Sequence, residues 1–276
     1  DHRDLHSFPT RRSSDLALTA ALIAPIVMLS LEMAVFRFLI DGRGNKKTQT
    51  AIITNSSQMI AFVALAASLL YIVAIQFIAI PYAWLVLGVT SAIIIANYCL
   101  QVARGLGDNI RFSIGSVVAG VSTVTLNVLF IVFMKMGATG MLLATMIGNL
   151  LCAAYLIYSL KIYTYFDISI AGKTTKKKLL SYSLPLIPNS VSWWVVNAAD
   201  RMIIAFFLGI TSNGIYAVAY KFPQIFSAFY SFFGMSWTES ASVHINSKDR
   251  DIFFSKVANL SLRIFGSLGA IIIVQY

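Results

Sequence analysis

The chain has 276 residues, of which 58% are hydrophobic and only 12% charged, and its mean hydropathy is +0.78. This composition excludes an ordinary soluble domain and is typical of a membrane protein. The net charge of +10 would suit a nucleic-acid-binding protein. The basic residues, however, lie in short stretches between apolar runs, which indicates membrane orientation and no nucleic-acid partner.

Residues 1–16, DHRDLHSFPTRRSSDL, differ from the rest of the chain. They contain six charged residues, two histidines and a proline, and an apolar run follows at once. They lack the apolar core and cleavage site of a signal peptide. The stretch resembles the peptide obtained by translating sequencing-adapter DNA. We therefore expect residues 1–16 to be a non-native, disordered leader without functional residues.

Eight apolar segments follow, and each is expected to be a transmembrane helix. Most are about 20 residues or longer, which is enough to cross a bilayer. They are too long for barrel strands and show no strict alternation of polar and apolar residues. The sequence therefore predicts an all-α, polytopic membrane helical bundle. The segments are 17–40, 48–78, 82–103, 112–134, 137–160, 179–209, 214–238 and 252–276.

The connections between these segments predict the orientation. One set carries twelve Lys and Arg residues, whereas the other set (79–81, 135–136 and 210–213) carries only Lys135. Cytoplasmic loops are enriched in basic residues, so the first set is expected in the cytoplasm. The outer connections are also too short to form a catalytic loop. The basic set comprises 41–47, 104–111, 161–178 and 239–251.

This orientation places the start of segment 17–40 on the outer side of the membrane. A chain starts more easily in the cytoplasm, so we expect one further helix before residue 17 in the parent protein. The sequence also stops at Tyr276, inside an apolar run. The chain is therefore expected to be an internal fragment of a larger polytopic protein.

Charged residues lie inside two consecutive apolar segments, on either side of the turn at 209–214. At 1.5 Å per residue, Asp200 lies roughly 13 Å and Lys221 roughly 10 Å from this turn. The geometry permits an Asp200–Lys221 pair across the hairpin, while Arg201 faces another direction. A charge at membrane depth is costly, so it normally marks a cavity, a pathway or a partner.

Four stretches of the sequence form a recognisable pattern. The sharpest is AADRMIIAFFLGITSNGIYAVAYKFP at 198–223, preceded by SYSLPLIPNS at 181–190. The other two are LEMAVFRFLI at 31–40 and LQVARGLGDNIRF at 100–112. Together they resemble the bacterial polysaccharide flippases, the oligosaccharide-lipid exporters of the multidrug/oligosaccharidyl-lipid/polysaccharide superfamily. Within this family, 31–40 is similar to the second helix and 100–112 to the fourth cytoplasmic-side connection.

The resemblance implies a two-lobed transporter fold around a central cavity, of which this chain holds about helices 2–9. The N-terminal lobe would comprise 17–165, a basic cytoplasmic linker 166–178, and the start of the C-terminal lobe 179–276. It implies alternating access without an ATP site or another cofactor, with proton or sodium coupling in some members. The implied function is to move polyprenyl-pyrophosphate-linked oligosaccharide to the periplasmic leaflet of the bacterial inner membrane. The expected partners are therefore the bilayer and the lipid-linked oligosaccharide.

A pyrophosphate needs cationic partners inside the membrane, because an unpaired phosphate in hydrocarbon is prohibitive. The candidates are Arg37, Arg201 and Lys221. Each has a structural alternative. Arg37 lies one turn from Asp41 and would suit a snorkelling anchor. Arg201 would suit a purely structural ion pair, and Lys221 would suit a pair with Asp200.

The candidate ion-coupling acids are Glu32 and Asp200. The structural alternative is polar packing against another helix for Glu32 and an ion pair that holds the bases in place for Asp200. Glu32 lies roughly 13 Å into the membrane, with no base one turn away on its own helix, and could exchange a proton. Polar residues between membrane helices either bind sugar hydroxyls or hydrogen-bond one another. The candidate sugar contacts are Asn97, Gln101 and Asn197.

Prolines 25, 185, 188 and 223 are expected to bend their helices.

Three other functions compete with this hypothesis. A peptidoglycan-precursor flippase and a multidrug/cation antiporter belong to the same superfamily. A drug antiporter should have mainly acids in its cavity, whereas here the three candidate bases outnumber the two acids. A membrane-embedded glycosyltransferase or polymerase needs large outer loops with acid/base groups, and the predicted outer loops are short. The sequence therefore favours a transporter of anionic cargo and no enzyme.

Overall fold

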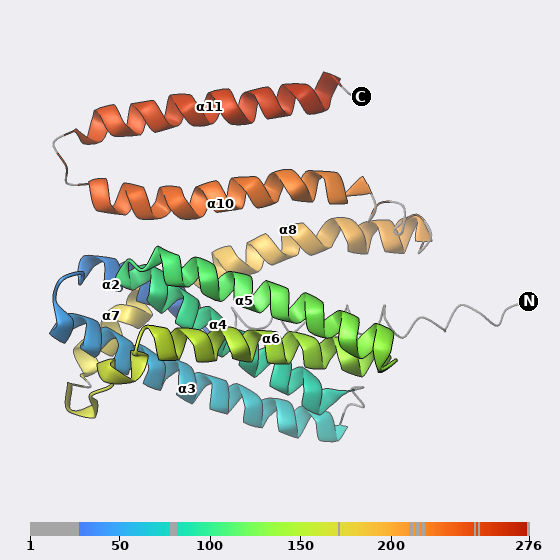
Figure 1. Cartoon of the computed structure of the whole chain (residues 1–276), viewed down its shortest axis with the longest axis horizontal. Helices are drawn as coiled ribbons and strands as arrows, with labels where there is room; N and C mark the ends of the chain where they lie inside the picture. The colour runs from blue at the N-terminus through green and yellow to red at the C-terminus, as the bar shows by residue number, and fades with distance from the viewer. Residues whose placement is uncertain are drawn as a thin grey trace, which may run out of the picture. The chain divides into compact units, whose positions relative to one another are not determined.

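A computed structural model describes residues 28–77, 82–170, 172–209, 219–245 and 249–274, with residues 212, 216 and 247. Their regular structure is helical and contains no strand, which confirms the predicted all-α class (Figure 1). The predicted leader 1–16 lies outside the described residues. The helices are α2 (Leu31–Asp41), α3 (Lys46–Phe77), α4 (Ala83–Leu106), α5 (Asn109–Asn127), α6 (Gly137–Ser159), α7 (Lys173–Ser183), α8 (Leu186–Phe207), α10 (Lys221–His244) and α11 (Arg250–Val274).

Four helices of the described part are long and apolar enough to cross a membrane. They are α3, α4, α6 and the helix at Asn109–Phe133, which is α5 extended by a π-helical segment at Val128–Phe133. The second half of α3 leaves large apolar side chains uncovered, and Phe62 and Phe77 are 74% and 85% exposed. Such a helix is stable only when lipid covers it. The protein is therefore a multi-pass membrane protein.

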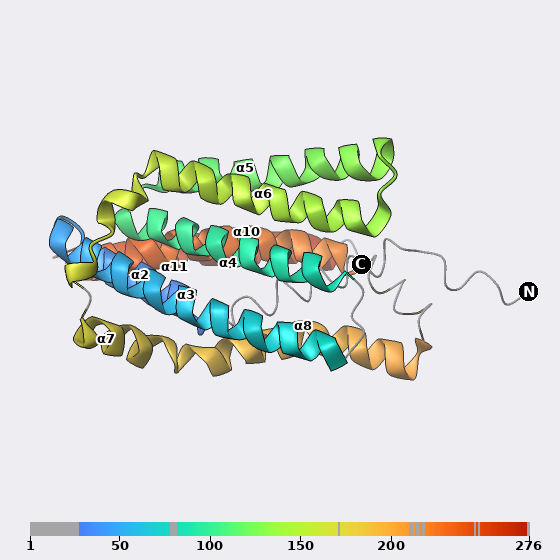
Figure 2. The ribbon, with the colours of Figure 1, turned by 90° about the horizontal axis from the view of Figure 1, so that it is seen from below.

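The chain forms two compact units, Asp1–Ala198 and Ala199–Tyr276, and α8 runs across the boundary between them. In the first unit α4 lies between α2 and α6 (Figures 1 and 2). Leu39 of α2, Val102 of α4 and Leu156 of α6 are fully buried in its core. Gly105 permits the close approach of α2 to α4, because a Cβ at this position would lie 2.6 Å from the Cβ of Leu39.

The basic connections of the first unit lie at one end of it. Arg43 donates hydrogen bonds from Nε to the carbonyl of Gly105 (3.0 Å) and from Nη2 to that of Arg104 (2.8 Å). Lys46 lies over the ring of Tyr165, 5.8 Å from its centroid. The connections after α2, α4 and α6 therefore meet, as Figure 1 shows at its left. The basic connections of this unit thus gather at one end, as the predicted orientation requires. Which end faces the cytoplasm stays a prediction.

The predicted loop 104–111 is mostly helical. Helix α4 continues to Leu106 and is followed by Gly107, whose φ of +87° suits glycine. Helix α5 begins at Asn109. Asp108 caps α5 by accepting a hydrogen bond from the backbone N–H of Arg111 at 3.0 Å. The apolar pattern predicts the part of each helix that crosses the membrane. The ends of α4 and α5 lie beyond that part, at Gly107 and Asp108.

The predicted helix 179–209 begins earlier and consists of two helices. Helix α7 starts at Lys173 within the predicted linker 166–178 and ends at Ser183, and α8 starts at Leu186. Pro185 has no N–H to donate to the preceding turn, so the interruption occurs at the expected place. Pro188 lies in the first turn of α8, where a missing N–H costs little. The lobe division itself stays a prediction.

In the second unit, α10 and α11 lie side by side and contact each other through aromatic rings. Tyr230 and Phe233 on α10 meet Phe265 edge-on, each with 5.4 Å between ring centroids. Trp237 stacks on Phe253 at 6.1 Å. Helix α10 continues to His244, six residues beyond the predicted end at 238.

Candidate functional site

Arg37 is the one predicted substrate cation whose side chain the structure describes. Its Nε lies 3.7 Å from Oδ2 of Asp41 one turn later on α2, and the two side chains are 42% and 54% exposed. Such an exposed pair contributes about 0–1 kcal/mol to stability. The guanidinium thus lies at the basic end with an accessible face, which suits both an interface anchor and a phosphate contact.

For the other candidate residues of α8 and α10, the structure describes the position in the helix but not the side chain. Asp200, Arg201 and Asn197 belong to α8, and Lys221 is the first residue of α10. Their side chains lie outside the described residues. The predicted Asp200–Lys221 pair and the cavity role of Arg201 therefore stay predictions.

Glu32 lies in the first turn of α2 and is 8% exposed. Its Oε2 atom is buried without a hydrogen-bond partner in the part of the chain that the structure describes. A buried carboxylate oxygen without a partner is rare and costly, and it calls for a functional explanation. Two residues earlier, Ser30 bonds Ser190 of α8, with 3.3 Å between the hydroxyl oxygens. Glu32 therefore lies close in sequence to a contact between α8 and the start of α2.

Asn97 and Gln101, the predicted sugar contacts, both lie on α4 and are half-buried. Oε1 of Gln101 accepts a hydrogen bond from Nη1 of Arg104 at 3.3 Å. Gln101 is therefore engaged by a neighbouring cation, as expected when polar groups in membrane helices bond one another. Its role as a sugar contact stays a prediction.

Arg104 is a buried cation that the sequence did not reveal. The sequence predicts it in the basic connection 104–111, but it lies in the last turn of α4 and is only 7% exposed. Its guanidinium carbon lies 4.3 Å from the ring centroid of Phe36 and 5.5 Å from that of Phe112. Gly107, a typical residue after a helix end, was the signal that α4 extends past Arg104.

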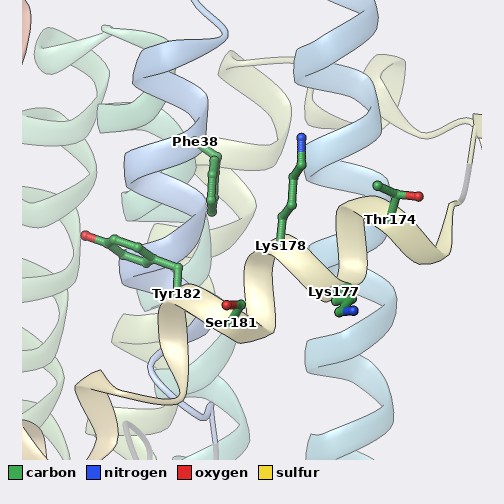
Figure 3. A pocket seen from close by; sticks show the side chains of 6 residues that line it. All are labelled: Phe38, Thr174, Lys177, Lys178, Ser181 and Tyr182. Atoms are coloured by element: carbon green, nitrogen blue, oxygen red, sulfur yellow. The ribbon is translucent and has the colours of Figure 1, made fainter.

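A pocket of about 530 Å³ opens between α2 and α7 at the basic end of the first unit. Phe38 supplies its wall from α2, and in Figure 3 Lys178 rises from α7 between the ribbons of α2 and α3. The rings of Phe38 and Tyr182 meet edge-on with 5.8 Å between their centroids. The remaining lining residues come from α7, and the full lining is Phe38, Thr174, Lys177, Lys178, Ser181 and Tyr182.

The five α7 residues of this pocket follow the spacing i, i+3, i+4, i+7, i+8, which places them on one face of a helix. Leu179 and Ser183, on another face, are buried. The sequence predicts a basic linker over 166–178, whereas the structure has a helix from Lys173 that places these side chains on one face. The lining combines two ammonium groups, three hydroxyls and two aromatic rings.

Buried polar side chains of α3 hold the chain that leads into α7. Thr54 donates its hydroxyl to the carbonyl of Tyr165 (3.0 Å) and accepts from the N–H of Asp167 (3.1 Å). Oδ1 of Asn55 accepts from the N–H of Gly172 at 3.0 Å. Hydrogen bonds from Ser169 lower the pKa of the Asp167 carboxyl. These bonds fix the start of α7, and thereby its pocket face, relative to α3.

No group of three or more His, Cys, Asp and Glu residues that could hold a metal ion occurs among the described residues. Cys99 and Cys152 are free thiols, both buried in the core of the first unit.

Residues 78–238 match the family of polysaccharide biosynthesis proteins. The matched region is more than half of the chain and includes α4 to α8 and most of α10. No curated protein and no solved structure matches the chain. The match agrees with the sequence motifs around Asp200 and Arg201 and with the multi-pass helical architecture. The chain belongs to the polysaccharide biosynthesis protein family of membrane proteins.

Proposed function

We propose that this protein moves polyprenyl-pyrophosphate-linked oligosaccharide from the cytoplasmic to the periplasmic leaflet by alternating access, during synthesis of surface polysaccharides such as O-antigen, capsule or exopolysaccharide. The observation that carries the proposal is the family match over 78–238, which includes Asp200, Arg201 and Lys221. Long apolar helices and a concentration of basic residues at one end of the first unit support it. Both features suit a carrier of an anionic lipid.

The proposed contacts to the pyrophosphate are Arg37, Arg201 and Lys221. Arginine offers a permanent charge with paired N–H donors, and lysine a movable point charge, so together they can follow a phosphate through a low-dielectric region. Amide side chains can bind sugar hydroxyls through both donors and acceptors. The proposed sugar contacts are Asn97, Gln101 and Asn197.

Coupling to a proton or sodium gradient is assigned to Glu32, with Asp200 as the second candidate. The buried and unpartnered Oε2 of Glu32, noted above for the described part of the chain, supports this role. A carboxylate in such a place can bind a proton or a cation in one state of the transport cycle and release it in another. No further cofactor is needed, because the ion gradient supplies the free energy.

The proposed location is the bacterial inner membrane, with the connections 41–47, 104–111, 161–178 and 239–251 in the cytoplasm. The positive-inside rule supports this side for the basic end of the first unit. Cysteine labelling on intact cells tests it. A cysteine at position 47 should react only after the cells are opened, and one at position 135 should react in intact cells.

The transport proposal is tested by expressing the gene in a bacterial strain that lacks its own flippase. Surface polysaccharide is measured for the wild type and for Arg201→Ala and Lys221→Ala, with Lys47→Ala as a control because Lys47 is exposed at the start of α3. We expect loss of export for the first two variants at unchanged protein level, and normal export for the control. Normal export in both Arg201→Ala and Lys221→Ala would refute the cationic-cavity assignment.

A further inference from the structure

We propose that the pocket between α2 and α7 binds a phosphate-bearing lipid headgroup at the membrane surface. It would be an anion site additional to the cavity residues Arg37, Arg201 and Lys221. The phosphate chemistry is inferred from the lining alone. Only the identification of the headgroup with the transported lipid rests on the proposed function.

The charge of the lining is positive. Lys177 and Lys178 are adjacent and exposed, and neither the lining nor α7 contains an acidic residue. Among the described residues neither ammonium group has an ion-pair partner. Both ammonium groups line the pocket, so an anion held in it, such as a phosphate, would be attracted by both charges.

The remaining lining groups complement the two lysines. Thr174, Ser181 and Tyr182 present hydroxyls, which can donate hydrogen bonds to phosphate oxygens. The rings of Phe38 and Tyr182 form an apolar wall beside them. A free inorganic anion would gain nothing from such a wall, whereas the first carbons of a lipid tail would pack against it. The combination therefore favours a lipid headgroup.

The site is preformed, and the proposed orientation places it at the membrane surface. Leu179 is buried in the core while the lysines remain exposed, as in helices that lie at a membrane surface. The bonds from Thr54 and Asn55 fix the chain that enters α7, so little order has to be gained on binding. A volume of about 530 Å³ is within the usual size of ligand pockets and accommodates a pyrophosphate with the start of a tail.

The test measures binding of radiolabelled geranylgeranyl pyrophosphate to the purified protein in nanodiscs of neutral phosphatidylcholine. The pocket variant is Lys177→Gln/Lys178→Gln. The matched control is Lys47→Gln/Lys173→Gln, which removes two exposed charges from the same end without touching the lining. Loss of two charge-assisted contacts should weaken binding by about tenfold or more, and the control should stay within about twofold. Lys177→Arg/Lys178→Arg, which retains both charges, should bind within about threefold of the wild type.

Two further arms identify the source of the phosphate. Adding phosphatidylglycerol to the nanodiscs asks whether an anionic phospholipid displaces the probe, and adding inorganic pyrophosphate asks whether the tail is needed. If phosphatidylglycerol displaces the probe and this displacement depends on the two pocket lysines, the site belongs to bulk phospholipid. If phosphatidylglycerol does not displace the probe, the site belongs to the pyrophosphate lipid.

Equal weakening in the pocket variant and the control would overturn the proposal, because general surface charge would then explain binding. Unchanged binding in the pocket variant, or equally strong binding of inorganic pyrophosphate, would overturn it as well. None of these measurements involves transport, so they are independent of whether Arg201→Ala and Lys221→Ala lose export. A failure of the pocket and a failure of the transport proposal are therefore distinguishable.

Discussion

The carboxamide oxygen of Asn55 accepts a hydrogen bond from the backbone N–H of Gly172, which lies 117 residues later in the chain and 3.0 Å away. Asn55 is fully buried on α3, and Thr54 beside it bonds Tyr165 and Asp167. The segment before α7 is thus attached to the first unit. The next interruption of helical structure lies at residues 184 and 185, between α7 and α8. Bending between these two helices is therefore expected at Pro185, beyond the anchored segment.

We expect Asn55→Ala to loosen this anchor and destabilise the protein by about 1–3 kcal/mol, because it leaves the Gly172 N–H without its acceptor. Hydrogen exchange measured by mass spectrometry should become faster in peptides that cover 166–172. Ser57→Ala is the control, because the hydroxyl of Ser57 bonds the carbonyl of Thr54 and the side chain of Tyr98, and no described contact joins it to residues 166–172. Equal exchange in the two variants would contradict an anchoring role for Asn55.

We expect Arg104→Lys to lower the thermal stability of the detergent-solubilised protein, although the charge is retained. A lysine cannot stack its head between Phe36 and Phe112 as the planar guanidinium does, and the loss should be about 1–2 kcal/mol. Arg111→Lys is the control, because Arg111 is half-exposed and pairs with Asp108 near the surface. A melting temperature equal to that of the wild type in Arg104→Lys would show that the stacking contributes nothing.

The membrane helices could be predicted from the sequence because their apolar runs are long, whereas their ends depend on capping. The position of Arg104 depends on where α4 ends, and Gly107 fixes that end by its backbone geometry. The start of α7 at Lys173 was missed because a lysine run resembles a loop, although lysine is a good helix former. The end of α4 and the start of α7 thus both depend on the helix and capping preferences of individual residues, which the apolar pattern does not include.

The charged candidates could be identified from the sequence, but the arrangement of side chains around them could not. Asp41 near Arg37 follows from their spacing on one helix. The pocket requires Phe38 and Tyr182, which are far apart in the sequence, to meet through the packing of α2 on α7. No local pattern encodes such a contact, so the pocket became visible only in the folded chain.

Gly105→Ala should separate α2 from α4 and destabilise the protein by about 1–3 kcal/mol. The added Cβ would lie 2.6 Å from the Cβ of the fully buried Leu39, which has no room to move away. Gly120→Ala on α5 is the control, because its Cβ would meet nothing within 4 Å. There the substitution should leave the melting temperature unchanged or raise it, since alanine favours helix over glycine. Destabilisation by Gly120→Ala as large as that by Gly105→Ala would refute the packing argument.

Arg37→Gln should reduce polysaccharide export several-fold at unchanged protein level if the guanidinium contacts the cargo. Its pair with Asp41 is too exposed to contribute more than about 1 kcal/mol, so loss of the pair alone should not unfold the protein. Asp41→Asn separates the two roles of Arg37, because it removes the pair and leaves the guanidinium available to a phosphate. Export by Asp41→Asn should therefore equal or exceed that of the wild type. If Arg37 serves only as an interface anchor, export should remain normal in both variants, and the phosphate contact would have to be withdrawn.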